Sequence, residues 1–329
     1  MIDIFIILLI ALALGFDFLN GFHDSANSIA TVVVTKTLKP LHAVLLAGIA
    51  NFVGYFIFGV AIANTVGKGI IESSYVTLPI IFAALIGAIA WNIMTWFLGL
   101  PTSSSHALIG GLVGAGIAAF GLKIVILTGV LKVFLFIFLA PLIGGIGAFI
   151  FTIIILWIFH RTDRNKTGKW FKRLQLVSAA AYSIGHGTND AQKTMGIIAL
   201  ILFSSGVISV FKVDTWVALS CQTAIALGTV FGGWRIVKTM GTSITKVRAL
   251  EGFCAETSSA LVLFGTAHLG IPVSTTHVIA GSLMGVGSVE NARNVKWITA
   301  RKILWAWILT IPITTIISFL VYLGVSVFL

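Results

Sequence analysis

Charged residues are scarce in this chain: they make up 9% of its 329 residues, whereas hydrophobic residues make up 58%. Soluble globular domains carry charge on roughly a quarter of their residues, so this scarcity leaves little room for a soluble domain. Apolar runs recur instead along nearly the whole length of the chain. This composition is typical of an integral membrane protein.

Paired cysteines and the signal of a cleavable leader are also missing. The two cysteines, Cys221 and Cys254, form no CxxC or Cys/His spacing, so we predict neither a disulfide nor a zinc site. Asp3 stands where a signal peptide carries positive charge, and the apolar character continues past Leu14. We therefore interpret the first apolar segment as the first membrane span.

Apolar windows long enough to cross a bilayer fall into two sets of five, separated by the basic stretch His160 to Arg173. A hydrocarbon core of roughly 30 Å requires about 20 helical residues. The windows are 2–35, 41–66, 77–98, 103–120 and 122–159 in the first half, and 176–206, 214–234, 250–269, 273–290 and 300–328 in the second. The 122–159 window has Pro141 in its middle and is long enough for two short spans, so we expect ten to twelve crossings.

The 21 Lys and Arg gather between these windows. Sixteen of them form four clusters: Lys36 and Lys39; six residues from Arg161 to Arg173; Arg235, Lys238, Lys246 and Arg248; and Arg293, Lys296, Arg301 and Lys302. With five crossings before the central stretch and five after it, all four clusters lie on one face, which the positive-inside rule makes cytoplasmic. Both termini then lie outside a multi-pass protein of the cell inner (plasma) membrane.

An odd number of crossings in each half inverts the second half relative to the first, and inverted repeats are typical of secondary transporters. We therefore predict an all-α membrane protein with a first repeat at 1–159, a basic cytoplasmic linker at 160–175 and a second repeat at 176–329. Broken helices are expected at the midplane. A straight helix over 2–35 would extend about 51 Å, so a break is expected near its polar cluster.

A motif repeated in both halves supports this division. Gly99-Leu-Pro-Thr-Ser-Ser-Ser-His106 recurs as Gly270-Ile-Pro-Val-Ser-Thr-Thr-His277 at an offset of 171, and eight of 18 positions from Gly99 to Gly116 are identical in the second copy. Chance similarity between apolar segments does not explain a shared PxSxxH. The glycines that follow both motifs indicate close helix packing.

A weaker repeat pairs Gly21-Phe-His-Asp-Ser-Ala-Asn27 with Gly187-Thr-Asn-Asp-Ala-Gln-Lys193, and aligns Asp24 with Asp190 at an offset of 166. An ionisable residue at membrane depth is costly and indicates a functional site by default. Asp24, Asp190 and Glu256 all lie inside apolar windows and are the main candidates. The competing interpretation is that a carboxylate makes a structural hydrogen bond between helices. For Glu256 this structural role is about as well supported as a functional one, and for Asp17 a structural role is preferred.

The hydroxyl motifs indicate an anion site. Pro followed by three Ser or Thr residues resembles a helix N-terminus, whose free N–H groups bind anions. Two such termini related by inversion can point at one site from opposite sides of a membrane. Apart from Arg301 at the start of the last window, no arginine lies inside a predicted span, so N–H groups, hydroxyls and Lys193 are left to hold the anion. The candidate hydroxyls are Ser103, Ser104, Ser105, Ser274, Thr275 and Thr276, for which ordinary helix caps are the alternative.

An anion in such a site favours a cation that travels with it. Oxygen ligands for Na⁺, or carboxylates for a proton, are available from Asp24, Asn27, Asn189, Asp190 and Glu256. A carboxylate near the anion accepts a hydrogen bond from hydrogen phosphate, which sulfate does not donate at neutral pH. His106 and His277 are expected to support the hydroxyl turns, and hydrogen-bonded structural roles are at least as well supported for His23 and His186 as proton relay or metal binding.

Together, these motifs resemble the PiT family of inorganic phosphate transporters over nearly the full length of the chain. The family has a GxNDxAN-type motif once in each half, and the resemblance implies an inverted-repeat α-helical transporter that moves phosphate with Na⁺ or H⁺. It places Asp24 and Asp190 at the transport site, the six hydroxyls on the anion, and Glu256 at the family's glutamate. The short basic central stretch resembles prokaryotic members.

Three departures from the family pattern bear on the coupling ion. His23 replaces the usual Asn, as in bacterial members that resemble proton-coupled transporters. Gln192 and Lys193 replace Ala-Asn, so a tethered cation can stand in for a bound one. Apolar residues surround Leu85, where some relatives have a counterpart of Glu256.

Other functions remain alternatives at this point. A sulfate permease, or a symporter of protons and a neutral complex of phosphate with a divalent metal, would use the same site, and an anion channel would show passive flux. An intramembrane hydrolase using Ser103–Ser105 with His106 is not expected, because adjacent residues of a helix point in different directions. We predict no cofactor beyond the coupling ion and no nucleic-acid partner, and the sequence leaves a homo-oligomer open.

Overall fold

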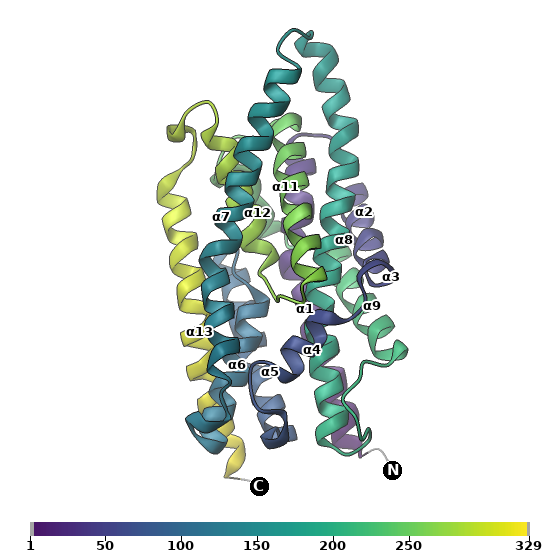
Figure 1. The fold of residues 1–329 in the computed structure, drawn as a ribbon, viewed down its shortest axis with the longest axis vertical. Helices are drawn as coiled ribbons and strands as arrows, with labels where there is room; N and C mark the ends of the chain where they lie inside the picture. Colours follow the sequence, from purple (N-terminus) through teal and green to yellow (C-terminus); the bar gives the residue numbers. More distant parts are fainter. Residues whose placement is uncertain (1–2, 328–329) are drawn as a thin grey trace.

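Every predicted apolar window forms helix. The computed structural model describes residues 3–327, without the side chains of 164–166, and Figure 1 shows helices packed along one long axis. They are α1 (Ile4–Val34), α2 (Pro40–Val53), α3 (Tyr55–Phe58), α4 (Ala61–Lys68), α5 (Leu78–Leu98), α6 (Ser104–Phe120), α7 (Leu127–Ile158), α8 (Arg164–Ser204), α9 (Thr215–Phe231), α10 (Trp234–Lys238), α11 (Ala249–His268), α12 (Thr275–Ser288) and α13 (Trp297–Ser326). Short helical turns are η1 (Ser73–Tyr75), η2 (Leu122–Ile124), η3 (Thr239–Ser243) and η4 (Ala292–Asn294). The all-α prediction is confirmed. Positions 1, 2, 328 and 329 of the predicted repeats lie outside the described residues.

Three segments differ from their expected form. The break expected near Asp24 is wrong, because α1 is one continuous helix of 31 residues. Its polar side chains are buried against other helices, so the backbone keeps its internal hydrogen bonds. The 122–159 window likewise forms the single helix α7, with Pro141 inside it. Most of the basic stretch 160–175 is helical, because α8 begins at Arg164.

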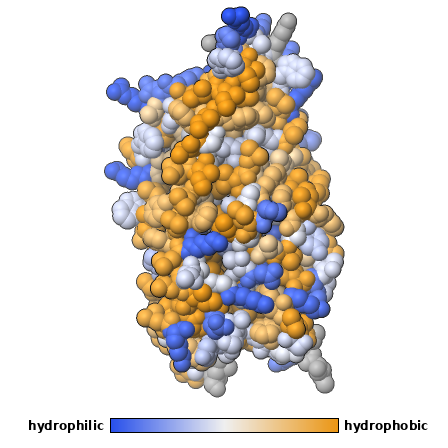
Figure 2. All heavy atoms as spheres, viewed as in Figure 1, coloured by the Kyte–Doolittle hydropathy of each residue, from blue (hydrophilic) through white to orange (hydrophobic). Residues whose placement is uncertain are grey.

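The surface of the bundle suits a lipid environment. Among the described residues, α1, α2 with α3, α5, α7 and α13 are long and apolar enough to cross a membrane, and the bent pair of α9 with α10 and η3 makes up to six. Apolar side chains cover most of the face in Figure 2, and hydrophilic ones gather around the α7–α8 turn at the top and in the lower part. The total of ten to twelve crossings stays a prediction.

The second half repeats the element order of the first. The series α5, α6, η2 and α7 corresponds to α11, α12, η4 and α13, and the long last helices carry Pro141 and Pro312 inside them. In Figure 1, α7 runs from bottom to top and α13 from top to bottom, while both ends of the chain lie at the bottom. We interpret this arrangement as the inverted repeat of 1–159 and 176–329.

Each half contains one helix that is broken at glycines. In the first half, α2 is followed by α3 and α4, with Gly59 between them at φ 66°. In the second, the α9–α10 pair is bent by 62° near Gly232, which has φ 71°. Positive φ is readily adopted only by glycine. The backbone breaks therefore fall in these helices and not in α1 and α8.

Side chains of α1 and α8 stabilise the two breaks. Gln192 Oε1 of α8 accepts hydrogen bonds from the N–H groups of Ile62, over 2.8 Å, and Ala63, at the start of α4. Ser25 Oγ of α1 accepts a hydrogen bond from the N–H of Gly233 at the start of α10, over 2.5 Å. Each long helix thus supplies an acceptor to a helix start in the other half, where N–H groups have no partner within the helix.

The two PxSxxH motifs form the tips of two helical hairpins. Gly99 and Gly270, with φ 64° and 63°, follow α5 and α11, and the chain then turns into α6 and α12. Figure 1 shows α5 and α6 in the lower half of the bundle and α11 and α12 in the upper half. The rings of His106 and His277 lie 4.8 Å apart, so the tips of the two hairpins meet in the middle of the protein.

The glycines after each motif allow close helix packing, as predicted. A Cβ at Gly114 of α6 would meet the backbone of Thr315 in α13, and a Cβ at Gly285 of α12 would meet the backbone of Gly145 in α7. Thr315 Oγ1 also donates a hydrogen bond to the carbonyl of Gly110 over 3.0 Å. Each hairpin is therefore held against the last helix of a half.

Replacing Gln192 with Met should weaken the start of α4. The variant keeps the length of the side chain but leaves the N–H groups of Ile62 and Ala63 buried without an acceptor, which costs about 1–3 kcal/mol. We expect a lower thermal unfolding midpoint for detergent-purified protein. Equal midpoints for Gln192→Met and the unaltered protein would contradict the capping role.

Candidate functional site

Two carboxylates from different halves lie together at the centre of the bundle. Asp24 of α1 and Asp190 of α8 are buried, with 2% and 1% of their surface exposed. With His186, they place three potential ligand atoms within 4.8 Å of one another. Residues separated by 166 positions in the weaker sequence repeat are thus neighbours in space.

The hydroxyls at the start of α12 bind both carboxylates. Thr275 Oγ1 donates a hydrogen bond to Asp190 Oδ2 over 3.0 Å, and Thr276 Oγ1 donates to Asp24 Oδ2 over 3.2 Å. Adjacent helical residues point about 100° apart, so each threonine reaches a different aspartate. The tip of the second hairpin is therefore tied to α1 and to α8 at once.

Lys193 is buried, and oxygen atoms from three elements surround its ammonium group. Nζ donates to Asp190 Oδ1 over 2.6 Å, to the carbonyl oxygen of Val273 over 2.8 Å and to the hydroxyl of Ser105. Ser105 lies at the start of α6, and Val273 lies just before α12. The ammonium group therefore joins the tips of the two hairpins.

Asn27 occupies the corresponding position on α1. Its Nδ2 donates to Thr276 Oγ1 over 2.8 Å, whereas its Oδ1 is buried without a hydrogen-bond partner. His23 lies beside it, with Nδ1 2.6 Å from Asp24 Oδ1 and Nε2 3.2 Å from Thr95 Oγ1. His23 thus has the hydrogen-bonded position that the sequence suggested, and Asn27 keeps one free acceptor.

The first turns of α6 and α12 supply further donors. Ser104 and Ser105 begin α6, Thr275 and Thr276 begin α12, and the first N–H groups of a helix have no partner within it. The remaining two candidate hydroxyls, Ser103 and Ser274, act as N-caps by accepting hydrogen bonds from the N–H groups of His106, over 3.2 Å, and His277, over 3.3 Å. Among the described residues, Ser104 Oγ is buried and has no hydrogen-bond partner. The centre therefore contains donors that no described group uses.

His106 and His277 lie behind the hairpin tips. The His277 ring stacks on Trp307 of α13, with centroids 3.9 Å apart, and Trp307 Nε1 donates to the carbonyl of Pro101 over 2.9 Å. These contacts link the first hairpin, the second hairpin and α13. The expectation that both histidines support the hydroxyl turns stays a prediction.

Glu256 lies apart from the central aspartates. It accepts hydrogen bonds from Gln175 Nε2 over 3.1 Å and from Ser178 Oγ over 2.5 Å. Ser178 precedes Asp190 by 12 residues on α8, which corresponds to about 18 Å along the helix. The structure therefore brings Asp24 and Asp190 together without Glu256.

Two other buried groups keep free oxygen atoms. Asn189 Nδ2 donates to the carbonyl groups of Gly185 and Leu263, but its Oδ1 has no partner. Neither carboxylate oxygen of Asp17 has a partner in hydrogen-bonding geometry, although Thr194 and Cys221 lie beside it. The structural hydrogen bond preferred for Asp17 therefore stays a prediction.

Two residues around the centre were not singled out as site candidates. Tyr182 donates from its hydroxyl to the carbonyl of Thr275 over 3.2 Å, and His186 Nδ1 lies 3.2 Å from Asn51 Oδ1. Tyr182, His186, Asp190 and Lys193 follow a spacing of four, four and three residues along α8. That helical spacing places them on one face, so it was the signal that could have identified them.

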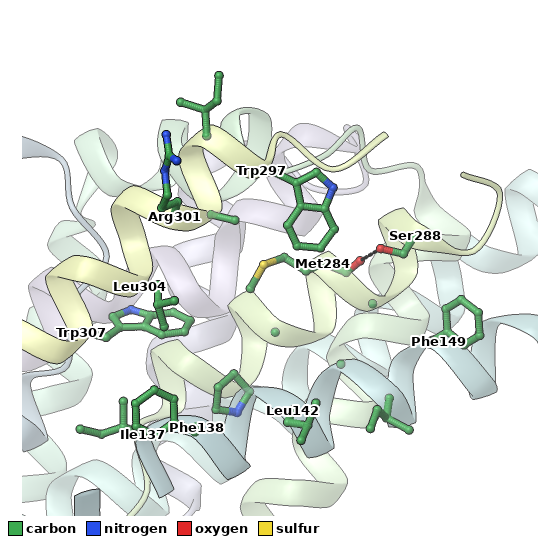
Figure 3. A pocket seen from close by; sticks show the side chains of 17 residues that line it. Ile137, Phe138, Leu142, Phe149, Met284, Ser288, Trp297, Arg301, Leu304 and Trp307 are labelled. Carbon is green, nitrogen blue, oxygen red and sulfur yellow. Dashed lines mark hydrogen bonds between the residues drawn. The ribbon is translucent and has the colours of Figure 1, made fainter. Parts of the chain in front are cut away.

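A separate groove of about 800 Å³ opens on the outside of the bundle, between α7, α12 and α13 (Figure 3). Apolar side chains such as Leu142, Met284 and Leu304 line it, and its lining also includes Arg301 and Ser288 on opposite sides. Trp307 lines its inner end and separates it from His277. Its lining does not suit a small anion, so the candidate site is the polar centre and not this groove.

The charges of the centre suggest what it binds. Asp24 and Asp190 carry two negative charges and Lys193 one positive charge, at a depth where unpaired charge costs several kcal/mol. The helix N-termini favour an anion, but an anion adds to the negative excess of the side chains. The arrangement therefore suits an anion that enters together with at least one cation.

Comparisons with known proteins identify the family of this chain. Residues 20–318 match the phosphate transporter family. A protein of Rhizobium meliloti named "probable low-affinity inorganic phosphate transporter" is 53% identical over 95% of this chain and 94% of its own length. One of the same name from Bacillus subtilis is 45% identical over 96% of both chains.

A solved structure named "The sodium-dependent phosphate transporter" has the same fold. It superposes with a TM-score of 0.89 and 24% sequence identity, covering 99% of this chain and 100% of its own. The family match extends over both halves and includes Asp24, both PxSxxH motifs and Lys193. The chain therefore belongs to the phosphate transporter family.

Proposed function

We propose that this protein carries inorganic phosphate through the membrane by symport with Na⁺ or H⁺. One observation carries the proposal. Asp24, Asp190 and Lys193 form hydrogen bonds with the tips of two hairpins, and these hairpins enter from opposite ends of the bundle. Such a centre is accessible to either end only when one hairpin moves, which is what alternating access requires.

Phosphate would lie between the N-termini of α6 and α12. The proposed ligands are the N–H groups and hydroxyls of Ser104, Ser105, Thr275 and Thr276, whereas Ser103 and Ser274 shape the turns as caps. Preorganised N–H groups at a helix start bind oxyanions without any arginine. The buried, unpartnered hydroxyl of Ser104 supports this assignment.

The coupling cation would bind beside the phosphate. Asp24 and Asp190 supply charge, and the free Oδ1 atoms of Asn27 and Asn189 supply neutral oxygen ligands. Glu256 of α11 would be a separate cation ligand, because its partner Ser178 lies about 18 Å along α8 from Asp190. The sodium dependence in the name of the solved relative favours Na⁺ as the ion.

Phosphate is favoured over sulfate on two grounds. Asp24 and Asp190 are acceptors in the centre, and hydrogen phosphate donates a hydrogen bond that sulfate does not donate at neutral pH. The relatives from R. meliloti and B. subtilis are both named for inorganic phosphate. Neither the sulfate permease nor the symporter of a metal–phosphate complex gains comparable support.

We also propose that the α7–α8 end faces the cytoplasm. Basic residues of the first three clusters meet there, because Lys36, Lys172 and Arg248 line one cleft. Lys246 and Arg293 line another, which joins the third cluster to the fourth. Positive charge gathered at one end indicates the cytoplasmic side, so both termini would lie outside.

The first test is uptake of radiolabelled phosphate into proteoliposomes under separate Na⁺ and proton gradients. We expect accumulation above the external concentration under one of the two gradients, with little inhibition by excess unlabelled sulfate. Flux that only equilibrates phosphate would indicate a channel. Strong inhibition by sulfate would restore the sulfate alternative.

We expect Asp24→Asn and Asp190→Asn each to abolish accumulation, because each change removes a negative charge that a coupling cation or Lys193 needs. Size-exclusion profiles of the purified variants should show that they remain folded. Asp3→Asn, at the exposed start of α1, is the control and should transport normally. Normal uptake by both central variants would rule out the carboxylate mechanism.

A further inference from the structure

We propose that the Lys193 ammonium group is a built-in cation that replaces one coupling ion. A centre with asparagine at both position 27 and position 193 would need one more mobile cation for each phosphate than this protein does. This inference rests on the proposed function, because it concerns the number of cations that accompany phosphate.

The Asp24 half-site on α1 and the Asp190 half-site on α8 differ in charge at this residue. Asn27 and Lys193 each lie three residues after a motif aspartate, about one helical turn further on. Asn27 reaches Thr276 and Lys193 reaches Ser105, and these hydroxyls occupy matching positions of the two PxSxxH motifs. A neutral amide on one side therefore corresponds to a positive charge on the other.

The partners of the Lys193 ammonium are those that a small hard cation takes. They are one carboxylate oxygen, of Asp190, one hydroxyl, of Ser105, and one backbone carbonyl, of Val273. Backbone carbonyls next to broken helices are common Na⁺ ligands in transporters. An ammonium group has three N–H donors, and these three oxygens use all of them.

The charge balance of the two half-sites differs in the same way. Asp190 has the ammonium at 2.6 Å, and this charge stays with α8 when phosphate leaves. Asp24 has the hydroxyl of Thr276 and the ring of His23 as hydrogen-bond partners, and Asn27 Oδ1 next to it remains free. The mobile cation therefore belongs at the Asp24 half-site, and the Asp190 half-site already holds its positive charge.

The decisive measurement compares Lys193→Asn with the unaltered protein in proteoliposomes. The cation-to-phosphate ratio is obtained from the phosphate gradient that just cancels net flux at a set cation gradient. We expect the ratio to rise by one in Lys193→Asn, together with one additional charge moved per phosphate. Lys132→Asn, which removes an exposed lysine of α7, should leave the ratio unchanged.

Equilibrium binding of ²²Na⁺ to purified protein in the presence of phosphate gives a readout that does not require transport. Lys193→Asn should bind one Na⁺ more than the unaltered protein, and Lys193→Gln serves if the asparagine variant does not fold. An unchanged coupling ratio would overturn the inference, and so would an unchanged Na⁺ count if the uptake test shows that Na⁺ is the coupling ion. Loss of phosphate binding without a gain in Na⁺ binding would instead make Lys193 a phosphate ligand.

These results also separate this inference from the proposed function. If the unaltered protein does not accumulate phosphate under any cation gradient, the proposed function fails. If it accumulates phosphate and Lys193→Asn retains the same ratio, only the role of Lys193 fails.

Discussion

The structure depends on holding two like charges close together away from water. Asp24 and Asp190 contribute atoms to one cluster only 4.8 Å across, and two carboxylates at such a distance are stable only with nearby positive charge and hydrogen-bond donors. Lys193, Thr275 and Thr276 supply these, and each reaches the cluster from a helix start or from one face of α8. The breaks and hairpin turns of the fold place these groups in the centre.

In the proposed symport, the same constraint would link the movements of anion and cation. Entry of phosphate would place further negative charge beside the two carboxylates, and in a site of low dielectric cations that enter with it would offset the repulsion. The Lys193 ammonium contacts both hairpin tips. Movement of either tip therefore breaks contacts with charged groups, so occupancy of the centre and the position of the hairpins depend on each other.

Much of this arrangement was predictable because its motifs occur once in each half of the sequence. The repeated PxSxxH identified the hairpin tips, since proline and glycine end one helix and the serine at position 103 or 274 caps the next. The offset between Asp24 and Asp190 identified the two motif helices. Length alone misled the prediction for α1, because a helix that buries its polar side chains in protein has no need to break at them.

Specific contacts between helices could not be predicted from the sequence. Glu256 lies in an apolar window like the two aspartates, but its bonds to Gln175 and Ser178 depend on which turn of α8 packs against α11. No periodicity within α11 carries that information. The hydrogen bonds that the N–H groups at the starts of α4 and α10 donate to Gln192 and Ser25 were missed for the same reason, since each joins residues of different halves.

The two sequence repeats are not two structural domains. One apolar core combines residues such as Ile80 and Leu112 with Ile198 and Ile225, and the other combines Ile29 with Leu283. The polar centre follows the same rule, since Asp24 bonds to Thr276 and Lys193 bonds to Ser105. A half folded alone would leave a charged group without its partner and apolar surface without cover, so the halves must fold together to form the site.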